Sequence, residues 1–364
     1  MRIAYVNLNW PRTRNSGVGK KILRHISEWR ALGHDVRFFM HTSDYEPRTD
    51  LIEADIFPFA VRGKLITEWE RVRAATQLVR AVEAFRPDLI YLRYSMYVYP
   101  VHRLASIAPL VEEMTTNDVT QHTGLGVLLS FYNRLTRGLL LRRVSGLVCL
   151  SKELADSPSL TVFAKPTRVI GDSIDLETIQ PLEAPNNDHP HLVFIGTPGA
   201  PWQGVDKLHV LAGLLPGLTF HVIGYDTLNG ITDLPKNLIL YGYLNTDQYK
   251  SVLAQMDLAI SSLALHRIGL DQSSPLKTRE CLAYGLPLIL PYADTDLDDL
   301  ECDFMLKIPN NEDNIRTHAG LIRDFAYKMR GRRANRGVFA VRIDSKYKEV
   351  ERLSFFNEIL ARSA

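Results

Sequence analysis

The chain has 364 residues, of which 46% are hydrophobic and 23% are charged, and these proportions exclude a disordered, collagen-like or coiled-coil chain. Its 43 basic and 41 acidic side chains give a net charge of +2, so overall charge provides no attraction to nucleic acid. The three cysteines, Cys149, Cys281 and Cys302, lie far apart in the sequence. They match neither a disulfide framework nor a metal-binding knuckle, which indicates a reducing compartment.

Targeting signals are not evident. The apolar run at residues 3–8 is too short for a signal peptide, and no run of about 18 uncharged apolar residues occurs. We therefore expect a cytoplasmic protein, and attachment to the inner face of the plasma membrane stays open.

Strand-like and helix-like patterns alternate along the first half of the chain. A helical spacing of apolar residues covers 22–32, and strand-like apolar runs occupy residues 3–8, 36–40, 89–92, 110–111 and 146–150. Uninterrupted apolar strands that are separated by helices predict a parallel sheet covered on both faces.

The same alternation restarts in the second half, with strand-like runs at residues 191–196, 218–224, 238–241, 258–263 and 286–290. Three prolines and two asparagines between residues 180 and 190 indicate a linker. We predict two doubly wound α/β domains at 1–178 and 191–343, a linker at 179–190, and a C-terminal helix at 344–364. Ligands are expected at the carboxyl ends of the strands, in a cleft between the domains.

Residues 272–287 carry the clearest chemical signal. Ser274 is a good N-cap and Pro275 suits the first helical position, whereas Gly285 and Pro287 end the helix. A helix of about three turns is therefore predicted between them.

This predicted helix could bind an anion. Its N-terminal N–H groups are free, and Lys277 lies in the first turn. Glu280, one turn further, is placed to accept hydrogen bonds from two neighbouring ribose hydroxyls. A capped helix with a solvated glutamate is an equally good interpretation.

Two glycine-containing loops join predicted strands to predicted helices, at residues 194–208 and 15–20. Such loops bind phosphate when their backbone N–H groups converge. Residues 15–20 have neither GxGxxG nor P-loop spacing, so for both loops an ordinary strand-to-helix connection is the alternative.

Six motifs in order resemble those of a retaining GT-B glycosyltransferase of family 4 (glycosyl transferases group 1), over nearly the whole chain. They include a "WKGVD" motif and an "Ex7E…AxGxP" signature, and they fall at Gly17 with 33–36, 148–151, 169–175, 202–206, 272–280 and 283–287. Any single match is weak, whereas six in order on a matching α/β pattern are strong.

The resemblance implies the GT-B fold: two Rossmann-like domains facing a central cleft, with the last helix crossing back onto the first domain. It also implies transfer of a sugar from a nucleotide diphosphate sugar, with retention at the anomeric carbon and without a metal ion or other cofactor. We expect a UDP- or GDP-sugar donor, a glycan, glycolipid or small-molecule acceptor, and a role in cell-envelope polysaccharide biosynthesis.

The resemblance also assigns site residues. Donor binding falls on Gly17, Gly196, Thr197, Gln203, Tyr243, Ser273, Ser274, Pro275, Leu276 and Glu280. The acceptor side falls on Glu113, Asn117, Asp118 and His266, for which ordinary surface polarity is the alternative.

The chain departs from the family pattern at three positions. Gln272 replaces the first glutamate of the signature, and Thr197 and Gln203 stand where many members have an arginine and a lysine for the diphosphate. Lys277 and Arg267 are our candidates to restore that charge, and they form the predicted catalytic set together with Gln272. A nucleotide-sugar epimerase and a non-catalytic sugar-nucleotide-binding subunit are the alternatives.

Asp294-Thr295-Asp296 resembles a metal-binding DxD motif. An ordinary loop is the favoured interpretation, so no metal ligand is assigned.

Residues 59–73 and 127–143 interleave apolar residues with arginines. This pattern suits docking on a membrane surface. Core helices with basic outer faces have the same pattern and are favoured slightly.

Overall fold

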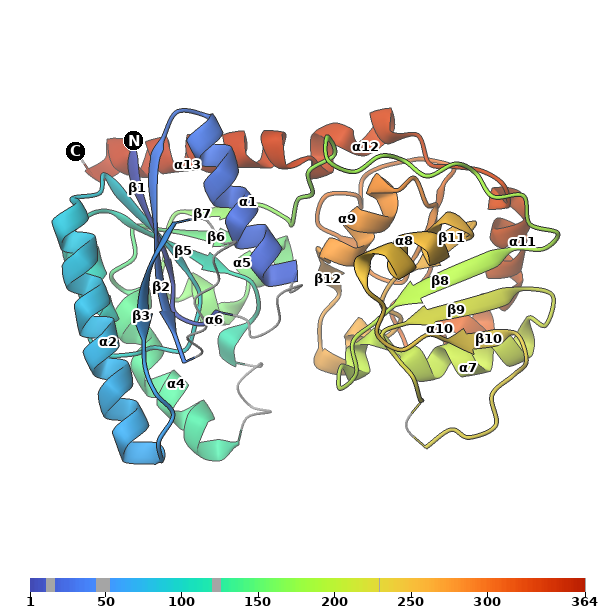
Figure 1. Cartoon of the computed structure of the whole chain (residues 1–364), viewed down its shortest axis with the longest axis horizontal. Coiled ribbons are helices and arrows are strands. Elements are labelled where there is room, and N and C mark those ends of the chain that lie inside the picture. Colours follow the sequence, from blue (N-terminus) through green and yellow to red (C-terminus); the bar gives the residue numbers. More distant parts are fainter. Residues whose placement is uncertain (11–16, 44–52, 120–125, 229, 364) are drawn as a thin grey trace. The chain divides into compact units, whose positions relative to one another are not determined.

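The computed structural model describes residues 1–10, 17–43, 53–119, 126–228 and 230–363. The chain divides into two compact units (Figure 1). The first contains Met1–Gly171 and the C-terminal segment from Ser345 onward, and the second contains Asp172–Asp344.

The first unit is built on a parallel sheet. Its seven described strands follow the order β3-β2-β1-β4-β5-β6-β7, which is the order of a doubly wound fold. They are β1 (Arg2–Asn7), β2 (Asp35–Thr42), β3 (Ala54–Pro58), β4 (Leu89–Arg93), β5 (Leu110–Met114), β6 (Gly146–Cys149) and β7 (Thr167–Val169).

Helices cover both faces of this sheet. One face packs against α1 (Gly17–Ala31) and α13 (Ser345–Ser363), where the Trp29 and Phe356 rings lie 5.4 Å apart. The other face packs against α2 (Lys64–Phe85), η1 (Val101–Ser106) and α4 (Val127–Leu141), and two short helices, α5 (Lys152–Ala155) and α6 (Pro158–Thr161), follow β6. Gly146 lets α13 approach β6, because a Cβ there would lie 2.8 Å from Ile359 Cδ1.

The second unit repeats the architecture. Its sheet order is β10-β9-β8-β11-β13-β15, with all neighbours parallel. The strands are β8 (His191–Ile195), β9 (Thr219–Ile223), β10 (Leu238–Leu240), β11 (Leu258–Ile260), β13 (Leu288–Leu290) and β15 (Met305–Lys307), and β12 (Gln272–Ser273) pairs with β14 (Ala293–Asp294). The helices are η2 (Pro201–Gln203), α7 (Val205–Leu214), α8 (Thr246–Ala254), η3 (Leu265–Ile268), α9 (Leu276–Ala283), α10 (Asn314–Thr317), α11 (Ala319–Met329) and α12 (Arg336–Ile343).

The predicted doubly wound α/β architecture is confirmed in both units. The sequence did not predict the edge strands β3, β7 and β15. An edge strand is buried less than a central strand, so its apolar run is weaker, as the intermediate exposure along β3 shows.

The boundary between the units differs from the predicted one. It falls at Gly171–Asp172, whereas the sequence placed it at 178, before a linker at 179–190. That segment is attached to the second unit: Leu182 N donates to Tyr284 O, and Arg333 donates to the carbonyls of Leu182 and Glu183. The prolines prevent regular secondary structure in this segment. Its carbonyl groups accept hydrogen bonds from Arg333, a residue distant in the sequence.

Within the described residues, no helix combines the length and the apolarity that crossing a bilayer requires.

Candidate functional site

Helix α9 begins one residue later than the predicted cap. Pro275 is the N-cap and its carbonyl accepts from Thr278 N, while Gly285 ends the helix region with a φ of 84°. The prediction that Ser274 caps the helix is wrong. Ser274 is buried, and its Oγ accepts from the backbone N of Asp172 at 2.6 Å.

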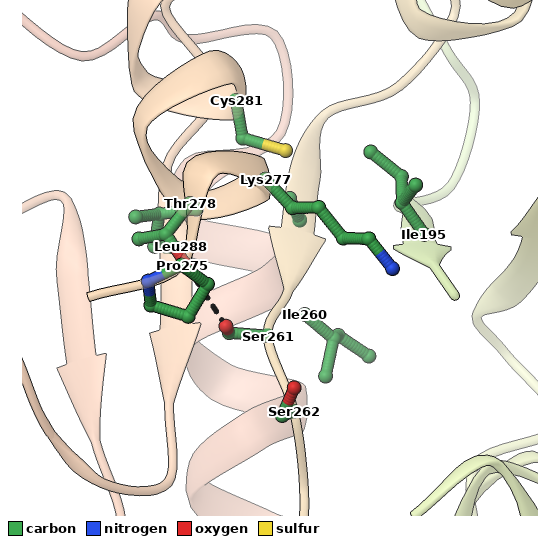
Figure 2. Close-up of a pocket in the computed structure, with 10 residues that line it drawn as sticks. Ile195, Ile260, Ser261, Ser262, Pro275, Lys277, Thr278, Cys281 and Leu288 are labelled. Carbon is green, nitrogen blue, oxygen red and sulfur yellow. Dashed lines mark hydrogen bonds between the residues drawn. The ribbon is translucent and has the colours of Figure 1, made fainter. Parts of the chain in front are cut away.

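Lys277 lies in the first turn of α9 and points into a pocket at the carboxyl ends of β8 and β11. Figure 2 shows its side chain reaching from α9 toward Ile195. The pocket is lined by Ile195, Ala259, Ile260, Ser261, Ser262, Pro275, Lys277, Thr278, Cys281 and Leu288. This edge of the sheet is where the doubly wound fold places ligands.

The Lys277 ammonium is buried without a hydrogen-bond partner in the described part of the chain. Burial lowers the pKa of Lys277 to about 8, against a smaller opposing effect of Cys281 and Glu280. A cation that has lost water and found no acceptor is costly, so this position is suited to receive an anion.

Three hydroxyl groups brace the pocket next to Lys277. Ser261 Oγ lies 3.0 Å from Thr278 Oγ1 and 2.6 Å from the Tyr292 hydroxyl, and Thr278 Oγ1 lies 2.9 Å from the same hydroxyl. Because these groups hydrogen-bond to one another, they hold the end of β11 against the start of α9.

The loop after β8 is held in shape by one of its own side chains and by a tyrosine that follows β9. Thr197 N donates to Gln203 Oε1 at 2.8 Å, and the Tyr225 hydroxyl donates to Thr197 O at 2.8 Å. Gly196 is required beneath them, because a Cβ there would lie 2.2 Å from the Tyr225 ring. Gln203 therefore supports the shape of the loop, a role that the sequence did not predict.

Arg267 is engaged by two carboxylates. It lies on η3 and donates to both oxygens of Asp206 at 2.8 Å and to Glu312, and this pairing holds its pKa above the ordinary value. His266 Nε2 lies 2.8 Å from the same Glu312. The Arg267 guanidinium is therefore already engaged by two carboxylates, and its role at a diphosphate stays a prediction.

Two predicted acceptor-side residues belong to buried ion pairs. Glu113 is fully buried on β5, with Lys21 Nζ at 2.8 Å. Burial alone would raise its pKa, but Lys21 and the other nearby cations hold it well below the ordinary value. Asp118 is also buried and accepts from Arg137 and from Asn133. Each carboxylate neutralises a cation inside the first unit.

Gln272 and Ser273 form β12, a strand that the sequence did not predict. The other predicted residues keep their expected places: Leu276 begins α9, Gly17 begins α1 in the first unit, and Asn117 follows β5. Tyr243 is exposed. Glu280 is partly exposed on α9, and burial together with the Glu280 carboxylate raises the pKa of the neighbouring Tyr249 well above its ordinary value.

The DxD-like pair binds an arginine. Arg279 is fully buried on α9, and its guanidinium pairs with both Asp294 and Asp296, the latter at 2.6 Å. Arg279 Nε also donates to Asp172 O at 3.0 Å. No sequence pattern pointed to Arg279, which ties α9 to β14 and to the start of the second unit.

Comparison with known proteins agrees with this geometry. The family model for the glycosyl transferase 4-like domain matches residues 16–170. No curated protein matches the chain.

Several solved structures share the fold across the whole chain. Sucrose-phosphate synthase from Thermosynechococcus elongatus is 12% identical with a TM-score of 0.66, covering 100% of both chains. The lipopolysaccharide outer core galactosyltransferase WaaB is 13% identical with a TM-score of 0.67, covering 98% of this chain and 100% of the other. HepE from Anabaena, in complex with UDP, is 14% identical with a TM-score of 0.64 and the same coverage.

The two parallel sheets and these structural neighbours define a protein of the GT-B fold. The glycosyl transferase 4-like domain at residues 16–170 lies in the first unit, in agreement with the resemblance to family 4 (group 1) glycosyltransferases.

Proposed function

We propose that the protein transfers a sugar from a nucleotide diphosphate sugar to a glycan, glycolipid or small-molecule acceptor, with retention at the anomeric carbon. The observation that carries this proposal is the buried Lys277 ammonium, which lies at the carboxyl ends of β8 and β11 without a hydrogen-bond partner among the described residues. The match to the glycosyl transferase 4-like family model supports the interpretation that this cation faces the diphosphate of the donor.

Lys277 would neutralise the leaving group. As the bond to the sugar breaks, negative charge grows on the departing nucleotide diphosphate, and a cation already in position stabilises that charge. The N-terminal N–H groups of α9 favour the same anion. Thr197 and Gln203 occupy the positions where many family members have an arginine and a lysine. Lys277 would supply the positive charge that these two positions lack, so that a side chain takes the role of a metal ion.

Two side chains would bind the rest of the donor. Glu280 accepts hydrogen bonds from the ribose hydroxyls, and Gln272 provides both an acceptor and a donor for the sugar. With the leaving group neutralised in this way, we propose a front-face path through an oxocarbenium-like transition state.

A UDP-sugar is the favoured donor. HepE has been solved with UDP and with UDP-glucose, and an α-glucosyltransferase of the same fold, 13% identical, has been solved with UDP. WaaB acts in lipopolysaccharide assembly by its name, which supports a role in cell-envelope polysaccharide biosynthesis on the cytoplasmic side of the membrane.

A donor screen with UDP-, GDP- and ADP-sugars tests this proposal. We expect release of a nucleotide diphosphate, in the presence of a chelator as well as without it. Lys277→Met should lower kcat by about a hundredfold, roughly 2.7 kcal/mol, and weaken donor binding by less, because the charge on the leaving group is larger in the transition state. Lys250→Met, at an exposed position on α8, is the matched control and should be neutral.

Three outcomes would contradict the proposal. Sugar isomerisation without release indicates the epimerase, and donor binding without turnover indicates a non-catalytic subunit. A Lys277→Met variant in which only KM changes would mean that Lys277 binds ground state and transition state equally.

A further inference from the structure

Helix α4 presents an apolar stripe to solvent. Leu128, Phe131 and Leu135 follow one another at steps of three and four residues, so they lie on one face, and Leu128 is 84% exposed and Leu135 69% exposed. The buried residues of α4, Asn133, Leu140 and Leu141, lie on the opposite side. Helix α4 therefore carries apolar side chains on its exposed side as well as on its buried side, unlike an ordinary surface helix.

The first two turns of α2 present a second apolar patch. Leu65 is 88% exposed and Trp69 62% exposed, and Ile66 is exposed between them. The two helices cover the same face of the sheet, and both contact η1. Figure 1 shows the N-terminal ends of α2 and α4 at the same end of the first unit. The two patches therefore belong to one surface.

This surface is strongly basic. Residues 59–73 and 126–143 together hold eight basic and only two acidic side chains, and the second of these segments has no acid at all, whereas the whole chain has a net charge of only +2. Arg62, Lys64, Arg73 and Arg134 are exposed, and the Arg73 guanidinium lies 5.6 Å from the centre of the Trp69 ring. Arg137 and Arg71 are exceptions, because Arg137 is neutralised by Asp118 and Arg71 is paired with Glu68.

Two kinds of occupant could cover this basic and apolar surface. A second copy of the chain, related by a twofold axis, would bring this surplus of positive charge against the same surplus on its partner. An anionic lipid surface is complementary in both respects, since it accepts apolar side chains among its acyl chains and attracts the surrounding arginines.

We propose that the exposed side of residues 62–73 and 127–142, named here the basic apolar face, docks into the headgroup region of an anionic bilayer. The apolar residues of α2 and α4 enter the boundary of the acyl chains, and the arginines contact lipid phosphates. Trp69 suits such a boundary, because its ring is amphipathic. The docking concerns this surface alone and does not depend on the donor or on catalysis.

Vesicle flotation of the full chain tests the docking. We expect binding to phosphatidylcholine vesicles that contain phosphatidylglycerol, weak binding to pure phosphatidylcholine vesicles, and a decrease with added salt. Leu128→Ser with Leu135→Ser should reduce binding at least tenfold. Arg134→Gln should reduce it about fivefold. Leu321→Ser, at an exposed apolar position on α11 in the second unit, is the matched control and should bind as the parent does.

All substituted side chains are exposed, so circular dichroism is expected to show unchanged folding. Equal binding with and without phosphatidylglycerol, or no binding at all, would overturn the proposal. A dimer in sedimentation velocity that the double serine variant abolishes, without vesicle binding by the parent, would assign the face to self-association. Because the readout is lipid binding, its failure is separate from any failure of sugar transfer.

Discussion

Two cations near the predicted site have opposite environments, and the difference decides which of them is available for chemistry. Arg267 donates to Asp206 and is also paired with Glu312, so its charge is neutralised within the second unit. The Lys277 ammonium is buried and finds no hydrogen-bond acceptor among the residues that the structure describes. A destabilising position of this kind is characteristic of functional sites, where binding a ligand offsets the cost.

This cost predicts that Lys277→Met stabilises the unliganded protein. The pKa of Lys277 falls from 10.5 when unfolded to about 8 when folded, so the unfolded chain binds more protons between these values and stability rises with pH across them. Below about pH 8 the cost is present in full. Lys277→Met should therefore raise the free energy of unfolding at pH 7 by on the order of 3 kcal/mol.

Thermal melts across this pH range measure the effect. The Tm advantage of Lys277→Met should be present at pH 7 and should shrink as the pH approaches 10.5, where the lysine is neutral in both states. Lys250→Met should melt as the parent does. A lower Tm for Lys277→Met at every pH would show that the ammonium is satisfied.

Helix α13 is the element that joins the C-terminal end of the chain to the first unit. Its helical spacing predicts an apolar face at Val350, Leu353, Phe356 and Leu360. In the structure Leu353 and Phe356 are buried, but Val350 is 55% exposed. A polar pair takes part of the buried face instead: Glu349 accepts from Trp29 Nε1 at 2.8 Å and from Arg352 Nε at 3.0 Å. The polar pair lies on the buried side because Trp29, on α1, provides a hydrogen-bond donor there.

Phe356→Ala should therefore cost about 3–5 kcal/mol of the free energy of unfolding, because the ring is fully buried against Trp29 and Tyr91. Urea unfolding followed by tryptophan fluorescence reports mainly on the first unit, since only Trp202 of the four tryptophans lies in the second. Val350→Ala is the control, with a change within about 0.5 kcal/mol. Similar losses for the two variants would mean that α13 is not packed through Phe356.

Across the whole molecule, each unit buries ionisable groups in its interior. The first unit encloses Glu113 with Lys21, and the second encloses Arg279 with Asp294 and Asp296. A histidine is buried in each unit as well: burial lowers the pKa of His25 in the first unit to about 4, outweighing Glu349, and lowers that of His221 in the second to about 4. The stability of both units consequently depends on pH.

Acid should destabilise both units well above the titration range of ordinary carboxylates. The unfolded histidines titrate near 6.5 and the folded ones near 4, so the unfolded chain binds more protons between these values. Stability therefore falls as the pH decreases from about 6.5 to 4, by on the order of 2 kcal/mol for each histidine. Urea midpoints across this range measure the loss of stability. His221→Gln should remove the part of this loss that His221 causes in the second unit. A midpoint that is constant over the range would refute the prediction.

Local sequence patterns were sufficient for the central strands and for the helix that carries Lys277. Residues 191–195 and 258–260 form buried strands because their apolar runs need only a sheet with both faces covered. Gly285 ends α9 because it adopts a positive φ, which is also a local property. Edge strands such as β3 escaped prediction because their burial depends on neighbours that the local pattern does not contain.

The sequence by itself determined the doubly wound α/β architecture, the order of the family motifs and the place of Lys277 in the first turn of a helix, since all of these follow from residues close together in the chain. Only the tertiary structure decided which charged side chains are neutralised by an ion-pair partner. Arg267 meets Glu312, Arg279 meets Asp294 and Glu113 meets Lys21 from different elements, whereas Lys277 meets no acceptor among the described residues. The sequence determines the charge of a side chain, whereas the fold determines its partner by bringing particular elements together.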